Sequence, residues 1–181
     1  TAYNLITGRY EVTSGKIFLK GNDITNLQPY EVKRRGLSRS FQITNIFPKM
    51  SVFENVRCSL LWAMDFKYSF WHLVGKQSQL NENAEKIIEE LNLKERRDTL
   101  AGVLSYAEQR ALEIGITIAG GSEVILLDEP TAGMSVSETE YIVDLIRKVT
   151  EGKTLVVVEH DMGVVFDLAD RISVLVYGEI I

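Results

Sequence analysis

The 181-residue chain is poor in cysteine, in long apolar runs and in net positive charge. Cys58 is its only cysteine, which excludes an internal disulfide and favours a reducing compartment such as the cytosol. No apolar run approaches the length that spans a bilayer, and no secretory signal pattern opens the sequence. We therefore expect any connection to a membrane to come through a partner. The net charge of −5 disfavours a protein that mainly grips nucleic acid phosphates.

Hydrophobic residues make up 45% of the chain, which suits one globular domain, with or without a subdomain. Strand-like and helix-like segments alternate, and this predicts an α/β fold with a mostly parallel sheet covered on both faces. We expect strands at 15–21, 37–41, 154–158 and 172–176, besides the one described next, and we expect the strand at 154–158 to be buried. We expect one helix to end near Gly8, a second to start at Pro29 and a third to cover 106–119. A fourth helix is expected to start with a capping box at Ser137–Glu140 and to run to Gly152.

The stretch Val124–Pro130 organises the chain. Its four apolar residues predict a strand buried on both faces, which ends at Asp128 and Glu129 before a proline. Ligands of open α/β sheets bind at the carboxyl ends of strands, and the period of two points these carboxylates in different directions. One carboxylate could hold Mg²⁺ and the other could orient or deprotonate water. Alternatively, the pair is only solvated or caps a neighbouring helix.

Between residues 43 and 100 the apolar residues recur at helical spacing, as at Ile87, Ile88 and Leu91. This pattern predicts a helical subdomain at 43–100, set into an α/β core formed by 1–42 and 101–181. Its middle holds five aromatic residues, which either dock a partner or pack the subdomain's own core, and we favour packing. They are Trp62, Phe66, Tyr68, Phe70 and Trp71.

Four features follow one another in a definite order. Gln42 ends a strand, Leu104–Gln109 opens a buried helix, Leu126–Thr131 contains the acidic pair, and His160 ends the next strand. This order and spacing resembles the nucleotide-binding subunit of ATP-binding-cassette (ABC) transporters, over essentially the whole chain. The implied fold is a P-loop-NTPase-like α/β core with a mostly parallel sheet, a small antiparallel β part and an inserted helical subdomain.

The resemblance implies roles for the residues at strand ends. Asp128 resembles the Walker B aspartate, which supports Mg²⁺, and Glu129 resembles the catalytic glutamate, which activates the attacking water. Gln42 resembles the Q-loop glutamine, which senses metal and water and links the chemistry to the helical insert. His160 resembles the switch histidine, which contacts the γ-phosphate. An isolated histidine at a strand end is more often structural, but its place one strand after the acidic pair favours the switch role.

The segment that opens the buried helix resembles the family's signature motif. Ser105 and Glu108 fit a capping box, and the helix end behind such a box is an anion site. In the family this segment closes over the γ-phosphate held by the opposite subunit of a dimer. Ala107 stands where the signature usually has glycine, and its Cβ is expected to hinder approach of the phosphate. Ser135 stands where Asp or Asn is usual, which is expected to weaken a dimer contact.

Three features are similar to the ATPase subunits of branched-chain amino-acid importers. They are Leu5–Tyr10, Phe41–Pro48 and the aromatic insert after Val56. This resemblance implies ATP and Mg²⁺ as cofactors, a homo- or heterodimer of nucleotide-binding subunits, transmembrane permease partners, and a cytoplasmic position on the inner face of the membrane. The lipopolysaccharide-export ATPase is a close relative and remains an alternative.

Two other classes of protein remain open. A soluble cassette ATPase acting on DNA or ribosomes is disfavoured by the single cassette, the lack of a long coiled coil and the acidic charge. A non-catalytic binding fragment is favoured by one absence, since no Gly-x-x-x-x-Gly-Lys-[Ser/Thr] phosphate loop occurs in the sequence. Thr1 resembles the residue directly after that loop, so the chain resembles an N-terminally truncated domain. We expect it to bind ATP poorly and hydrolyse it negligibly.

Overall fold

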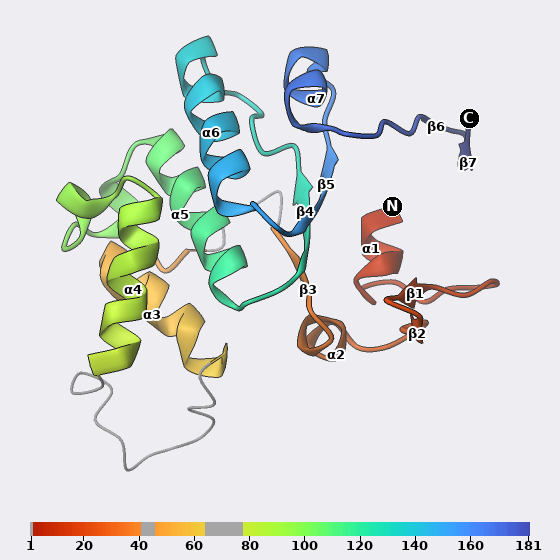
Figure 1. The fold of residues 1–181 in the computed structure, drawn as a ribbon, viewed down its shortest axis with the longest axis horizontal. Coiled ribbons are helices and arrows are strands. Elements are labelled where there is room, and N and C mark those ends of the chain that lie inside the picture. The colour runs from red at the N-terminus through yellow and green to blue at the C-terminus, as the bar shows by residue number, and fades with distance from the viewer. Residues whose placement is uncertain (1, 41–45, 64–77) are drawn as a thin grey trace.

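The computed structural model describes residues 2–40, 46–63 and 78–181. A parallel sheet with the strand order β3-β4-β5 lies at its centre (Figure 1). The strands are Leu37–Arg39, Val124–Asp128 and Thr154–Val158, and β4 pairs with both of the others. Two small antiparallel pairs accompany it, β1 (Phe18–Leu19) with β2 (Asn22–Asp23), and β6 (Leu175–Val176) with β7 (Glu179–Ile180). The predicted α/β fold with a parallel sheet is confirmed.

Helices cover both faces of the sheet, as its buried central strand requires. Helices α5 (Tyr106–Ala119) and α6 (Val136–Val149) lie on one face, and α1 (Ala2–Ile6) and α2 (Pro29–Arg34) lie on the other (Figure 1). The residues of β4 alternate between two hydrophobic clusters, Ile125 and Leu127 in the larger and Leu126 in the smaller. The prediction that this strand is buried on both faces is confirmed.

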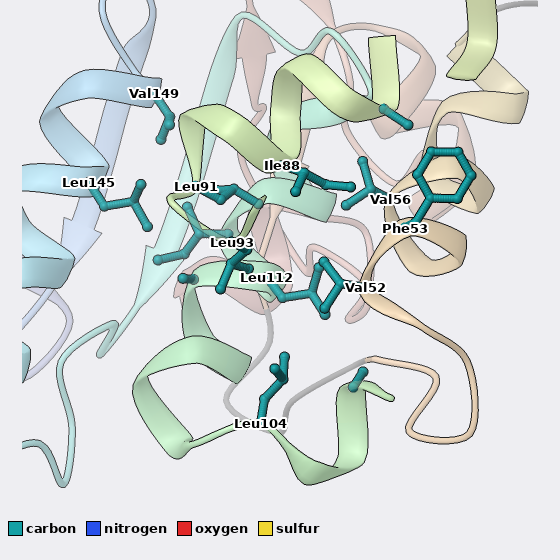
Figure 2. Close-up of a cluster of buried hydrophobic side chains, with 14 of the residues drawn as sticks. Val52, Phe53, Val56, Ile88, Leu91, Leu93, Leu104, Leu112, Leu145 and Val149 are labelled. Carbon is teal, nitrogen blue, oxygen red and sulfur yellow. The ribbon is translucent and has the colours of Figure 1, made fainter. Parts of the chain in front are cut away.

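The larger cluster extends from the sheet into the helical segment. Helices α3 (Val52–Ala63) and α4 (Ser78–Glu90) pack on each other and on α5, and short 3₁₀ turns follow at Lys94–Arg96 and Ala101–Val103. Figure 2 shows this junction, where Val52 and Val56 of α3 approach Ile88 of α4 and Leu112 of α5. The helical segment and the sheet thus share one continuous core. Of the five aromatic residues of the predicted insert, Trp62 belongs to α3, and Phe66, Tyr68, Phe70 and Trp71 lie outside the described residues.

Strand β5 has the bounds predicted from its sequence, but it is not buried. Its alternate residues Val156 and Val158 are exposed, and within the described ranges only β4 pairs with it. The prediction that this strand is buried is therefore wrong. The predicted strand at 172–176 is shorter than expected, and it pairs with β7 outside the parallel sheet. An apolar run specifies a strand, but the neighbours of that strand decide whether it is covered.

Most helix ends follow their local signals. Gly8 ends α1 in the left-handed region, at φ +70°, and a Cβ there would collide with the carbonyl oxygen of Leu27. Pro29 opens α2 as predicted. The predicted capping box of α6 is wrong by two residues, since the backbone N–H of Ser135 donates to Glu138 at 2.9 Å. Helix α7 (Met162–Leu168) is short, and none of the described helices is long and apolar enough to cross a membrane.

Candidate active site

The acidic pair lies at the carboxyl end of the central strand, as predicted. Strand β4 ends at Asp128, and the N–H of Glu129 still donates to the carbonyl of Val158 on β5, at 2.9 Å. The chain then turns at once, with Glu129 in the left-handed region at φ +47°. For a residue other than glycine, the left-handed conformation costs about 1–2 kcal/mol of conformational energy. Surrounding contacts must therefore hold Glu129 in it. We call residues 128–132 the acidic turn.

Asp128 faces a cation that sequence reasoning missed. Nη2 of Arg39 donates to Oδ2 of Asp128 at 2.8 Å, and their side chains are only 10% and 17% exposed. Arg39 also donates to Oδ1 of Asn4 at 2.6 Å, and its guanidinium lies 5.3 Å from the centre of the Tyr3 ring. The sequence offers one signal for this pair. Residues two positions apart in a strand share a face, so Arg39 lies on the same face of β3 as the apolar Leu37.

Tyr3 ties helix α1 to the same end of the sheet. Its hydroxyl lies 2.7 Å from the carbonyl oxygen of Val156 and 3.2 Å from that of Leu127, so it bridges β5 and β4. Burial raises the pKa of the Tyr3 hydroxyl well above its usual range, and the nearby Asp128 carboxylate raises it further, against an opposing effect of Arg39. The phenol is therefore neutral at physiological pH and serves as a hydrogen-bond donor.

The predicted capping box of the signature-like segment is present. The N–H of Glu108 donates to Oγ of Ser105 at 3.3 Å, and the N–H of Ser105 donates to the Glu108 carboxylate at 2.8 Å. Burial opposes ionisation of Glu108, but hydrogen bonds from Ser105 and Arg96 outweigh it and lower the pKa of the carboxyl. Ala107 is buried, so its methyl group packs inside the protein.

The start of helix α5 lies beside the acidic turn, although the two are far apart in the sequence. The hydroxyl of Tyr106 donates to the carbonyl of Ala132 at 3.1 Å. One turn further along α5, Arg110 donates to the carbonyls of Asp128, Glu129 and Pro130. Neither contact was foreseen from the sequence, because no local pattern marks a buried arginine whose partners lie on another element.

His160 follows β5 at the same end of the sheet, where Val158 pairs with Asp128. Its side chain is 76% exposed and lies 3.8 Å from the Glu159 carboxylate. Glu159 was not singled out from the sequence, yet it is buried and accepts hydrogen bonds from the N–H and hydroxyl of Thr131, at 3.1 and 2.8 Å. The fold thus collects Asp128, Glu129 and His160 at one edge. Thr1 and Gln42 lie outside the described residues.

The carboxylates at this edge fit a cation that is bound mainly by the phosphates of a nucleotide and only partly by the protein. Within the part of the chain that the structure describes, no three His, Cys, Asp or Glu side chains gather into a metal cage. Mg²⁺ at nucleotide sites is bound through one or two carboxylates together with substrate phosphates and water. Oδ2 of Asp128 bonds to Arg39, and Oδ1 has no hydrogen-bond partner among the described residues. Asp128 can therefore offer one oxygen to such an ion.

Comparison with known proteins places these residues in a family. A family model described as ABC transporter matches residues 1–132. The high-affinity branched-chain amino acid transport ATP-binding protein BraF of Pseudomonas aeruginosa is 33% identical, over 98% of this chain and 72% of its own length. Its counterpart LivG of Escherichia coli is 31% identical over the same shares.

Solved structures agree with the sequence matches. The ADP conformation of MJ1267, an ATP-binding cassette of an ABC transporter, superposes with a TM-score of 0.82 at 28% identity, over 99% of this chain and 72% of that one. A dimeric post-hydrolysis state of the cassette MJ0796, bound to ADP and Pi, gives a TM-score of 0.71 at 25% identity, over 90% and 70%. The motif order, the fold and these relatives lead to one conclusion: the chain belongs to the ABC transporter family.

Proposed function

We propose that this chain is the ATP-hydrolysing part of an ABC importer for branched-chain amino acids. The observation that carries the proposal is the acidic turn, which presents Asp128 and Glu129 at the carboxyl end of the central strand and beside the capped start of α5. The importer assignment comes from the names of BraF and LivG and from their identity with almost the whole chain.

Each residue of the edge has a proposed task. When bound, Mg²⁺ and ATP would supply a polarised γ-phosphoryl group, and Asp128 would help to hold the cation. Glu129 orients the attacking water and accepts its proton. The exposed imidazole of His160 would contact the γ-phosphate, and Gln42 would link the metal and the water to the helical segment. Ser105, Ala107 and Glu108 would form the phosphate-facing helix end that a second subunit uses, and Thr1 would contribute to nucleotide binding.

Transport requires partners that the proposal also names. Two nucleotide-binding subunits form a homo- or heterodimer on transmembrane permease subunits, at the cytoplasmic face of the membrane. The dimeric state of MJ0796 with ADP and Pi supports the first of these contacts. Neither nucleic acid nor a ribosome is part of the proposal, in keeping with the net charge of −5.

The 181 residues by themselves are proposed to be nearly inactive. Their sequence contains no phosphate loop, so the amide cradle and lysine that stabilise charge on the transferred group have no counterpart. Calorimetry with Mg-ATP tests this on the chain and on a version extended upstream through a phosphate loop. Binding by the extended version alone is expected, and equal binding by both would contradict the proposed importance of the loop.

Two further measurements separate hydrolysis from transport. Glu129→Gln in the extended version is expected to retain ATP binding and to lose at least about a hundredfold in turnover. Glu140→Gln, on the surface of α6, is the matched control and should leave turnover unchanged. Uptake of labelled leucine by cells that carry the permease tests the substrate. Unchanged uptake when Glu129→Gln replaces the parent would refute the importer assignment, whereas the ATPase assignment would still rest on the turnover measurement.

A further inference from the structure

Helix α5 is fastened to the acidic turn by an arginine that is almost completely buried. Arg110 is 4% exposed. Its Nη2 donates to the carbonyl oxygens of Asp128 and Glu129, each at 3.0 Å, and its Nε donates to that of Pro130 at 3.1 Å. One guanidinium therefore holds three consecutive main-chain carbonyls. Hydrogen bonds from a charged donor are the stronger kind, and here the donor itself is shielded from water.

The charge of Arg110 is balanced from its own helix. Nη1 donates to Oε2 of Glu113 at 2.7 Å, and Glu113 is only 3% exposed. This pair lies one turn apart on α5, so the helix carries its own counterion and the guanidinium remains charged away from water. The planar fork then presents its remaining edges to the turn in a fixed orientation. An ammonium group is a point donor and cannot span three carbonyls in the same way.

We propose that Arg110 is a positioning residue that holds Glu129 in its left-handed conformation and makes the place of its carboxylate depend on the place of helix α5. The inference deepens the proposed function, because it rests on Glu129 being the residue that orients water. Glu129, at φ +47°, has the strained backbone of the turn, and its carbonyl is one of the three that Arg110 holds.

The same helix begins at Ser105, whose capping box forms the proposed phosphate-facing end. Between this cap and Arg110, the Tyr106 hydroxyl adds a contact to Ala132 at the far end of the turn. Four of the five carbonyls of the acidic turn thus accept hydrogen bonds from side chains in the first turns of α5. If a second subunit contacts the cap and displaces the start of α5, these hydrogen bonds displace the backbone of Glu129 as well.

The test compares local and global effects in the 181-residue chain, without nucleotide. The double variant Arg110→Met with Glu113→Gln removes both buried charges, so neither is left uncompensated. Thr117→Ala is the matched control, because it removes a buried hydrogen bond of α5, from the Thr117 hydroxyl to the Glu113 carbonyl at 2.9 Å, that does not reach the turn. Amide hydrogen exchange and the ¹³Cα chemical shift of Glu129 are measured by NMR in each protein.

In the double variant, the amides of Glu129 and Ala132 should exchange at least about tenfold faster relative to the Ile114 amide, since the turn loses three charge-assisted hydrogen bonds. The Glu129 chemical shift should leave the value typical of a left-handed residue, and Thr117→Ala should change neither readout. A folded double variant with an unchanged Glu129 shift would overturn the proposal. If the double variant does not fold, Arg110→Lys decides, because it should show the same changes to a smaller degree, and wild-type behaviour at Glu129 would overturn the proposal.

Discussion

Arg39 lies against Asp128, with 2.8 Å between Nη2 and Oδ2, although the two residues come from opposite halves of the chain. Strands β3 and β4 bring them together through the parallel register that pairs Leu37 with Val124. Both side chains are largely buried, so the Asp128 carboxylate depends on the Arg39 guanidinium for compensation. The carboxylate proposed to hold the metal is therefore also part of the structural framework.

The Arg39→Met variant should lower the free energy of unfolding by about 3 kcal/mol, because it leaves the Asp128 carboxylate buried without its cation. Urea denaturation measures this loss. The double variant that adds Asp128→Asn removes the uncompensated charge and should recover more than half of it. A double variant as unstable as Arg39→Met would show instead that lost packing over the Tyr3 ring accounts for the cost.

Acid should weaken the cap of helix α5. The folded state lowers the pKa of Glu108 from its ordinary 4.5, so the carboxylate's contribution to stability is complete above that value. It is lost as the pH falls through the folded-state pKa. Between about pH 5 and about pH 3 the wild type should therefore lose more unfolding free energy than Glu108→Gln, which keeps the shape of the box. Parallel pH dependence of the two proteins would contradict this.

Alkali should act through Tyr3. Its pKa is raised in the folded state above the ordinary 10.0, so unfolding releases a proton at high pH. The contribution of Tyr3 to the free energy of unfolding therefore decreases as the pH rises above the pKa of Tyr3 in the unfolded state. Tyr3→Phe should cost about 1 kcal/mol at neutral pH, since it removes the donor to the carbonyls of Val156 and Leu127. The gap between the two proteins should narrow above about pH 10, as followed by urea denaturation. A constant gap would rule out this role for the Tyr3 proton.

Two glycines at α5 offer a matched pair. A Cβ at Gly115 would collide with the fully buried side chain of Leu91, and Gly115→Ala should destabilise the protein by about 1–2 kcal/mol despite the better helix propensity of alanine. At Gly120, which ends the helix, an added Cβ meets only Cε of Lys33 at an ordinary 3.6 Å. Gly120→Ala should leave the melting temperature nearly unchanged. Equal losses from the two substitutions would contradict the packing argument.

Sequence patterns predicted the elements that rest on local chemistry. The bounds of α5 follow from the capping box at Ser105 and the apolar helix behind it, and the end of β4 follows from an apolar run that stops at acidic residues. The start of α6 was misplaced because two overlapping segments have the same spacing, one from Ser135 to Glu138 and one from Ser137 to Glu140. Only the packing of the folded helix selects between them.

Contacts between distant elements could not be predicted in this way. Arg39 and Arg110 each read as an ordinary charged residue, since the carbonyls and carboxylates that they bind belong to other elements. The exposure of Val156 could not be predicted for the same reason, because an apolar strand has the same sequence pattern whether or not it is buried. The strand and helix ends that carry the proposed site residues could thus be located from motifs, whereas the arginines that hold these elements together required the fold.

The capping boxes have a consequence for the order in which the chain folds. Helices α2, α5 and α6 each begin with contacts between residues three positions apart, which form with little loss of chain entropy. The pairing of β3 with β4 joins the two halves of the chain and is entropically the more demanding event. We therefore expect the helices to gain structure early and the acidic turn to be completed late, so that the proposed catalytic edge is among the last parts of the protein to form.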